Sequence, residues 1–190
     1  VRLATIGKLD FRSGADHGIE ETHLATHRDK LDIHSLFREQ EILPRYDLLH
    51  KHRATGPADS TEAYAGDREV SEMAVRWLKE GQPPARPWIL MVNFNDHHRP
   101  WNPPRELWEY YDSRIRLEDL DERFTEDRLR LHPYHQIYGR HHVGELLTPK
   151  EMRRALVGYH ASCEMLDRHV GQVLQGLDET GQREETLIVY

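Results

Sequence analysis

An apolar run, Trp88–Phe94, most constrains what this chain can fold into. It is rich in β-branched and aromatic residues and is bounded by prolines, which predicts a buried strand of a mainly parallel sheet. Two histidines, an aspartate and two asparagines follow within Asn95–Pro104. Ligands of open α/β sheets bind beyond the carboxyl ends of the strands. The segment is therefore either part of a ligand site or an ordinary surface loop.

A second predicted strand, Val1–Ile6, leads into the glycine-flanked segment Gly7–Gly14. Glycines let the backbone turn sharply, so the strand end can direct the ammonium group of Lys8 at an anion. Arg12 adds a second cation. The alternative is a solvated charged turn, which is common at such positions.

Helical periodicity predicts the other regular elements. A helix is expected to begin at Asp67 as N-cap and to stop at Gly81. A further helix is expected over Arg105–Tyr111. A long helix is expected to begin at the Thr148–Glu151 capping box and to lead to a strand at Thr186–Tyr190. Helices that alternate with strands indicate an α/β fold.

Two charged segments lack clear periodicity. Ala15–Ser60 reads as a surface excursion with at most a helical turn at Ser35–Glu41, and Asp112–Val143 reads as an irregular, solvent-facing loop. Loops of this length in compact domains are usually lids, binding loops or mobile segments.

Composition narrows the function classes. The 190 residues suit one domain or a large piece of one, and the net charge of -7 without a basic stripe excludes a nucleic-acid-binding surface. No apolar run is long enough to cross a membrane. The single cysteine, Cys163, forms no internal disulfide and is expected to be a packing residue of the long helix.

Fourteen histidines raise the question of a metal site. The adjacent pairs His97–His98 and His141–His142 are expected to point to opposite sides of an extended chain, and the ligand spacings of zinc sites are missing. We therefore predict no metal site formed by this chain alone.

Several segments resemble sulfatases of the alkaline-phosphatase superfamily. Ile6–Phe11 resembles their Gly-Lys-Trp-His segment, and Asn93–Pro100 resembles their Ser-Phe-x-x-Pro-His-x-Pro segment. Their order and separation also fit, as does the long helix that leads into a Thr-Leu-Ile-Val-Tyr strand. The branch most similar to this chain is that of arylsulfatase K, which the family associates with removal of 2-sulfate from glucuronate. The segments that indicate this branch are Gly7–Gly14, His132–Pro133 and Tyr159–Cys163 with Asp167.

The resemblance implies a fold and two catalytic residues. The fold would be a partial alkaline-phosphatase-like sandwich, a mostly parallel sheet flanked by helices, and residues 1–190 would be an internal part of one sulfatase catalytic domain, truncated at both ends. Lys8 matches the lysine that contacts the sulfate and the catalytic formylglycine. His98 matches the histidine that contacts the sulfate ester and assists the leaving oxygen.

The resemblance also implies substrate-binding roles for Asp10, Arg12 and His97. Asp10 stands where many sulfatases have a second histidine, although the arylsulfatase K branch has the same Lys-Leu-Asp. Asp10 is expected to meet substrate hydroxyls, to orient Lys8 or Arg12, or simply to cap a turn.

The formylglycine motif, Cys/Ser-x-Pro-x-Arg, and the Ca²⁺ ligands are expected outside this chain, so the isolated chain is expected to be inactive and to fold poorly. The expected substrate is a small-molecule or glycan sulfate ester, and the family suggests a secreted, periplasmic or lysosomal protein. A phosphodiesterase or phosphonate hydrolase of the same superfamily, or a non-catalytic binding member, remains an alternative.

Overall fold

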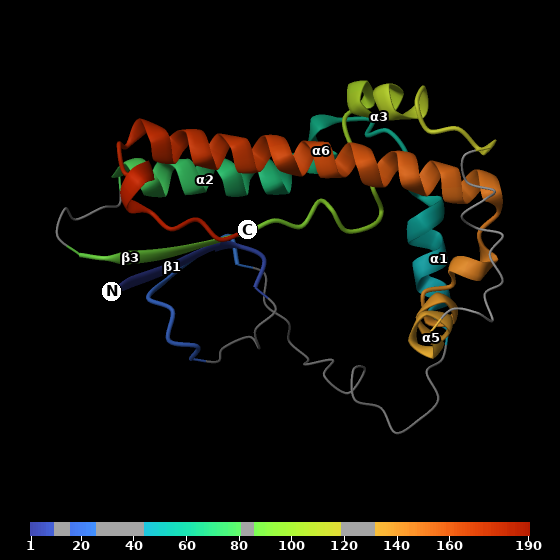
Figure 1. Ribbon diagram of the computed structural model, residues 1–190, viewed down its shortest axis with the longest axis horizontal. Helices are drawn as coiled ribbons and strands as arrows, with labels where there is room; N and C mark the ends of the chain where they lie inside the picture. Colours follow the sequence, from blue (N-terminus) through green and yellow to red (C-terminus); the bar gives the residue numbers. More distant parts are fainter. Residues whose placement is uncertain (10–15, 26–43, 81–85, 119–131) are drawn as a thin grey trace. The chain divides into compact units, whose positions relative to one another are not determined.

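The computed structural model describes residues 1–9, 16–25, 44–80, 86–118 and 132–190 (Figure 1). The chain forms two compact units. The first comprises Val1–Leu31, Ala65–Asp96 and Met165–Tyr190, and the second comprises Asp32–Tyr64 and His97–Glu164.

The first unit contains a parallel three-stranded sheet. Its strands are β1 (Arg2–Gly7), β2 (Glu21–His23) and β3 (Trp88–Asn93), in the order β2-β1-β3. Ala4 pairs with Glu21 on one side and with Leu90 on the other, both in parallel register. The mainly parallel sheet predicted from the sequence is thus confirmed.

Helix α2 (Ala65–Glu80) lies along one face of β1 and β3 (Figure 1). The alternate strand residues that point to this face pack against the apolar side of α2 and against the carboxyl-terminal part of α6. The buried cluster consists of Ala4, Ile6, Val70, Ala74, Trp77, Leu78 and Leu177. Ile89, on the other face of β3, is 52% exposed. The prediction that β3 is a buried strand is therefore wrong, because the described helices cover only one of its faces.

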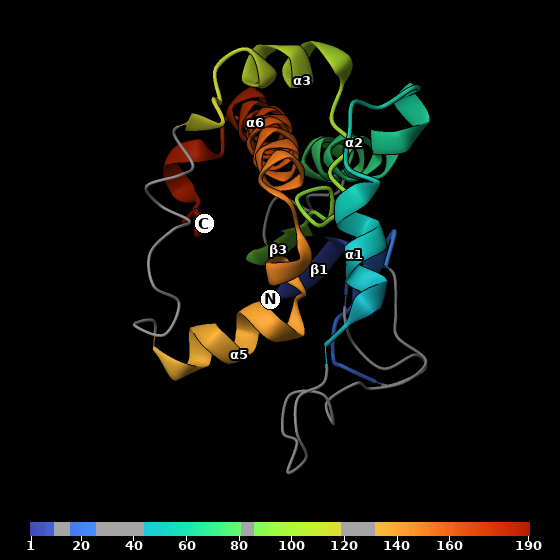
Figure 2. The same ribbon diagram turned by 90° about the vertical axis from the view of Figure 1, so that its right-hand side faces the viewer.

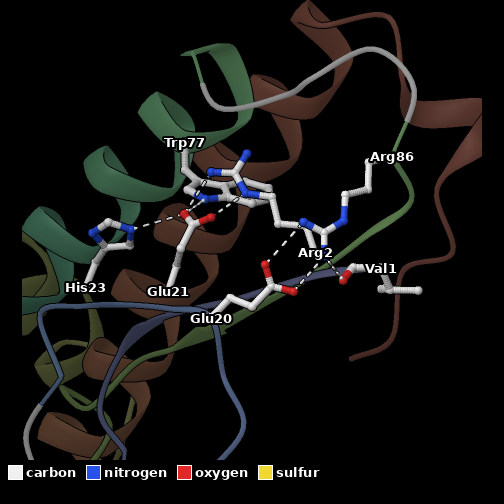
Figure 3. A network of polar contacts seen from close by, with 7 residues as sticks. All are labelled: Val1, Arg2, Glu20, Glu21, His23, Trp77 and Arg86. Carbon is white, nitrogen blue, oxygen red and sulfur yellow. Dashed lines mark hydrogen bonds and ion pairs between the residues drawn. The ribbon is translucent and has the colours of Figure 1, made fainter.

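Polar contacts attach β2 to strand β1 and helix α2 of the same unit (Figure 3). The Glu21 carboxylate accepts two hydrogen bonds from the Arg2 guanidinium and one, at 3.0 Å, from the Trp77 indole. These donors hold the pKa of Glu21 at about 2, chiefly through the bonds from Arg2. Arg86 bonds Glu20 and the Val1 carbonyl. Since these partners come from distant segments, no local pattern signals β2.

The residues Thr186–Tyr190 do not form the predicted strand. They follow a 3₁₀ helix at Arg183–Glu185 and make no ladder with any described strand, and Leu187 is 88% exposed. A strand exists only through hydrogen bonds to a neighbour. An apolar, β-branched sequence alone is not enough to form one.

The second unit is helical (Figure 2). Its helices are α1 (Tyr46–Arg53), α3 (Arg105–Asp112), α5 (Pro133–His141), the first part of α6, and short 3₁₀ helices at Thr61–Tyr64 and Gly144–Leu146. The helix predicted at Arg105–Tyr111 is confirmed. The prediction that Ala15–Ser60 and Asp112–Val143 are irregular is wrong where α1 and α5 form. Helix α5 begins because His132 Nδ1 accepts the Tyr134 N–H at 3.2 Å and Pro133 occupies the first helical position.

Helix α6 (Pro149–Glu179) is the longest element, with 31 residues. Its predicted capping box is confirmed: the Thr148 N–H donates to Glu151 at 2.8 Å, and the Glu151 N–H donates to Thr148 Oγ1 at 3.3 Å. The turn predicted at Ser35–Glu41 and the predicted stop at Gly81 lie outside the described residues.

Candidate active site

Lys8 follows β1 directly, beside the end of β3. Its backbone N–H donates to the Asn93 carbonyl at 3.1 Å, and Asn93 Nδ2 donates to the buried Thr5 hydroxyl at 3.0 Å. The preceding residue, Gly7, has a φ of +95°, and a Cβ there would lie 2.0 Å from the Asn93 carbonyl oxygen. Only glycine permits this approach. The structure therefore delivers Lys8 at the carboxyl edge of the sheet, as the sequence predicts.

Asp67 secures the loop that follows β3. Its carboxylate, 2% exposed, accepts the Asn95 N–H at 2.8 and 2.9 Å and the Asp96 N–H at 2.7 Å. The prediction that Asp67 is the N-cap of α2 is wrong. The helix already begins at Ala65, so the Asp67 side chain lies within the first turn and bonds the loop instead.

Asp96 is half-buried beside Asp67. Burial, followed by the charge of Asp67, raises the pKa of Asp96 to about 6, although a hydrogen bond from the Asp67 backbone offsets part of the effect. Within the described residues, Asp96 Oδ2 has no hydrogen-bond partner. A carboxyl group with this pKa can exchange a proton close to neutral pH.

In the second unit, His97 and His98 lie in a turn with their rings together. The ring centroids are 4.6 Å apart and the planes are inclined by 38°. The expectation that the two rings point to opposite sides is wrong, because the backbone turns here instead of continuing as an extended strand. His98 is exposed and His97 is half-buried. The turn thus leaves His98 exposed at the surface of the second unit.

Trp101 holds this turn together. Its indole Nε1–H donates to the His97 carbonyl at 2.8 Å, and its backbone N–H donates to Thr55 Oγ1 at 3.3 Å. The ring packs edge-on against Tyr159 at a centroid distance of 5.7 Å. The proline-rich sequence around Trp101 shows no pattern from which this role can be predicted.

Arg99 reaches helix α5. Its Nη2 lies 2.9 Å from Nδ1 of His142, the residue after the helix, and the Tyr138 and His142 ring centroids are 4.1 Å apart. Burial, followed by the charge of Arg99, lowers the pKa of His142 to about 4. The imidazole is therefore neutral at physiological pH and accepts a hydrogen bond from Arg99. The rings of His141 and His142 are also close, at 5.1 Å, so this pair does not point to opposite sides either.

The predicted site residues fall in both units. His97 and His98 lie together in the second unit, whereas Lys8 lies beside Asn93 in the first. Asp10 and Arg12 lie outside the described residues. The residues that sequence reasoning missed are Asp67 as the partner of the β3 loop and Trp101 as the partner of the His97 carbonyl.

Neither a calcium cage nor the formylglycine precursor is found in the described part of the chain. No three His, Cys, Asp or Glu side chains there are grouped so that they could hold a metal ion. Cys163 is a half-buried residue of α6 without the proline and arginine of the formylglycine motif. Among the described helices, none is long and apolar enough to cross a lipid bilayer.

Comparison with known proteins identifies the family. The sulfatase family model matches residues 10–190. Arylsulfatase K of Gallus gallus is 25% identical over 97% of this chain, and choline-sulfatase of Rhizobium meliloti (strain 1021) is 25% identical over 76% of it. Iduronate 2-sulfatase of Mus musculus is 28% identical over 70% of the chain. The chain spans 34%, 29% and 26% of these relatives, respectively. Because the family match covers nearly all residues, the chain belongs to the sulfatase family.

Proposed function

We propose that the full-length protein containing this chain hydrolyses sulfate esters of sugars or aryl alcohols, with Lys8 and His98 as catalytic residues. One observation carries the proposal: Lys8 directly follows β1, and His98 lies in the loop that follows β3, its parallel neighbour. Residues beyond the carboxyl ends of such strands line the ligand crevice of α/β proteins. Membership of the sulfatase family supports the choice of sulfate esters.

Each residue has a distinct role in this proposal. The fixed positive charge of Lys8 stabilises the negative charge that builds on the non-bridging sulfate oxygens in the transition state. His98 donates a proton to the leaving oxygen, a step suited to an imidazole, which is a common general acid in catalysis. We propose Asp10, Arg12 and His97 as substrate-binding residues.

We expect formylglycine and Ca²⁺, which the family resemblance implies, to be supplied from outside residues 1–190. The sequence therefore represents part of one sulfatase catalytic domain in this proposal. We also propose a secreted, periplasmic or lysosomal location for the protein, as the family resemblance suggests.

The test compares ester classes on the full-length protein. We expect turnover of 4-nitrophenyl sulfate and of a sulfated glucuronide, with a lower kcat/KM for bis(4-nitrophenyl) phosphate. A preference for the phosphodiester would replace the proposal with phosphoester hydrolysis. Binding of sulfated sugars without turnover of any ester would indicate a non-catalytic member of the family.

A further inference from the structure

The side chain of Trp101 holds the peptide group that joins His97 to His98. The carbonyl oxygen of this group belongs to His97 and accepts the indole N–H of Trp101 at 2.8 Å. A peptide group is planar, so fixing this carbonyl also fixes the direction in which the N–Cα bond of His98 leaves it. The hydrogen bond therefore restricts the orientation of His98 through the backbone, without touching its imidazole.

Trp101 is itself held by the segment after α1 and by helix α6. Its backbone N–H donates to the fully buried Thr55, and its carbonyl accepts the Gly56 N–H at 3.2 Å. Gly158 of α6 approaches so closely that a Cβ there would lie 2.9 Å from Trp101 Cβ. Tyr159, next in the helix, meets the indole ring edge-on. These contacts give the indole N–H a fixed position from which to bond the turn.

Asn102, the residue after Trp101, also bonds the segment that follows α1. Asn102 Nδ2 donates to the carbonyls of Ala54 and Gly56, each at 3.1 Å. Backbone and side-chain bonds from two consecutive residues thus join this loop to the segment that follows α1. The indole N–H of Trp101 is the group that extends this attachment to the histidine turn.

We propose that Trp101 is a positioning residue for His98, because its indole N–H orients the His97–His98 peptide so that the imidazole meets the sulfate ester in a productive geometry. This inference rests on the proposed role of His98. Displacement of a reacting group by about 1 Å can lower a rate by about a hundredfold. Trp101 therefore influences the rate of the chemical step more than the binding of substrate.

The test is Trp101→Phe in the full-length protein, which removes the indole N–H and keeps an aromatic ring. The matched control is Trp88→Phe, which removes an indole N–H that donates to Gln182 at 3.2 Å in the first unit. We expect kcat to fall at least about tenfold in Trp101→Phe with KM nearly unchanged, and kcat to stay near wild type in the control.

A double-mutant cycle separates positioning from general stability. In a His98→Ala background, the indole N–H has no imidazole to orient, so adding Trp101→Phe should lower kcat no further. Equal losses in the two backgrounds would show that Trp101 acts independently of His98 and would overturn the inference. Equal kcat values for Trp101→Phe and Trp88→Phe would overturn it as well.

An NMR measurement tests the inference without turnover. In protein labelled with ¹³C-histidine, the ring signals of His98 should shift or broaden in Trp101→Phe and stay unchanged in Trp88→Phe. If the wild-type protein hydrolyses no sulfate ester, the proposed function fails while the His98 signals still report on the turn. Unchanged His98 signals in Trp101→Phe would overturn the positioning role, whatever the activity.

Discussion

Both carboxylate oxygens of Asp67 accept the backbone N–H of Asn95, at 2.8 and 2.9 Å. One of them also accepts the N–H of Asp96 at 2.7 Å. Hydrogen bonds to a charged acceptor are stronger than neutral ones, and a carboxylate in the first turn of a helix is further stabilised by the helix dipole. Asp67 thereby joins α2 to the loop that leads from β3 toward the histidine turn.

We expect Asp67→Asn to lower the free energy of unfolding by about 2–3 kcal/mol, because a buried amide has one acceptor oxygen and its NH₂ group would face backbone donors. Urea unfolding of the full-length protein measures this change. The control is Glu69→Gln, which neutralises an exposed carboxylate of the same helix and should change stability by no more than about 0.5 kcal/mol. Similar values for the two variants would contradict the role given to Asp67.

The raised pKa of Asp96 predicts how the free energy of unfolding depends on pH. The native state holds the Asp96 proton up to about pH 6, whereas the ordinary pKa of an aspartate carboxyl group is 3.8. Between these values the native state binds more protons, so the Asp96 contribution to stability is present at low pH and is lost as pH rises through 6.

We therefore expect Asp96→Asn to stabilise the protein by about 1 kcal/mol at pH 7.5, a value reduced for solvent screening, and to have little effect near pH 4. Chemical unfolding at both pH values measures the difference. Asp59→Asn, at a side chain that is 99% exposed, is the control. Equal effects of Asp96→Asn at the two pH values would show that the Asp96 pKa is not raised.

Glu21 and its neighbour Glu20 form a matched pair (Figure 3). The Glu21 side chain is 27% exposed and bonds both Arg2 and Trp77, whereas the Glu20 side chain is 45% exposed and pairs with Arg86. We expect Glu21→Gln to lower the free energy of unfolding by about 1–2 kcal/mol at pH 7 and Glu20→Gln by no more than about 0.5 kcal/mol.

The Glu21 effect should disappear in acid. Because the pKa of Glu21 is lowered from 4.5 to about 2, its contribution is complete above pH 4.5 and is lost as pH falls toward 2. Thermal unfolding scans across this range follow the loss. A destabilisation by Glu21→Gln that persists undiminished near pH 2 would contradict the ionic origin of the effect.

Two glycines of α6 should respond oppositely to alanine. At Gly158 a Cβ would lie 2.6 Å from Thr55 Cγ2, whereas at Gly171 a Cβ would meet no atom of the described residues within 4 Å apart from the adjacent residues and backbone of its own helix. We expect Gly171→Ala to stabilise the protein by about 0.5–1 kcal/mol through helix propensity and Gly158→Ala to destabilise it by about 1–3 kcal/mol through overpacking. Urea unfolding of both variants measures the contrast, and stabilisation by Gly158→Ala would contradict the close packing.

The proposed catalytic residues predict losses of turnover. We expect Lys8→Ala and His98→Ala each to reduce kcat for sulfate esters by about two to three orders of magnitude with the fold retained, by analogy with the loss of one oxyanion donor. Steady-state kinetics and circular dichroism measure the two properties. Lys51→Ala and His50→Ala, at exposed positions of α1, are the controls. Near wild-type turnover in Lys8→Ala or His98→Ala would remove that residue from the mechanism.

Most errors of the sequence predictions concern contacts between distant segments. Three polar residues form β2 because β1 and a distant tryptophan supply their partners. The apolar segment Thr186–Tyr190 forms no strand because no described strand pairs with it. Asp67 looks like an N-cap from its neighbours in sequence, but its partners lie 28 and 29 positions away. Helix propensity and hydrophobic period contain no information about such partners.

The sequence by itself determined the long helix α6, strand β3, the sharp backbone turn at Gly7 before Lys8 and the resemblance to sulfatases. These features depend on periodicity, a capping box, backbone sterics and short motifs, all of which act within a few residues. Only the tertiary structure decided that Trp101 bonds the His97 carbonyl, that Asp67 bonds the β3 loop and that the His97 and His98 rings lie together. The physical reason is that each of these depends on where folding places particular atoms, and the local backbone preferences that a sequence reveals do not specify those positions.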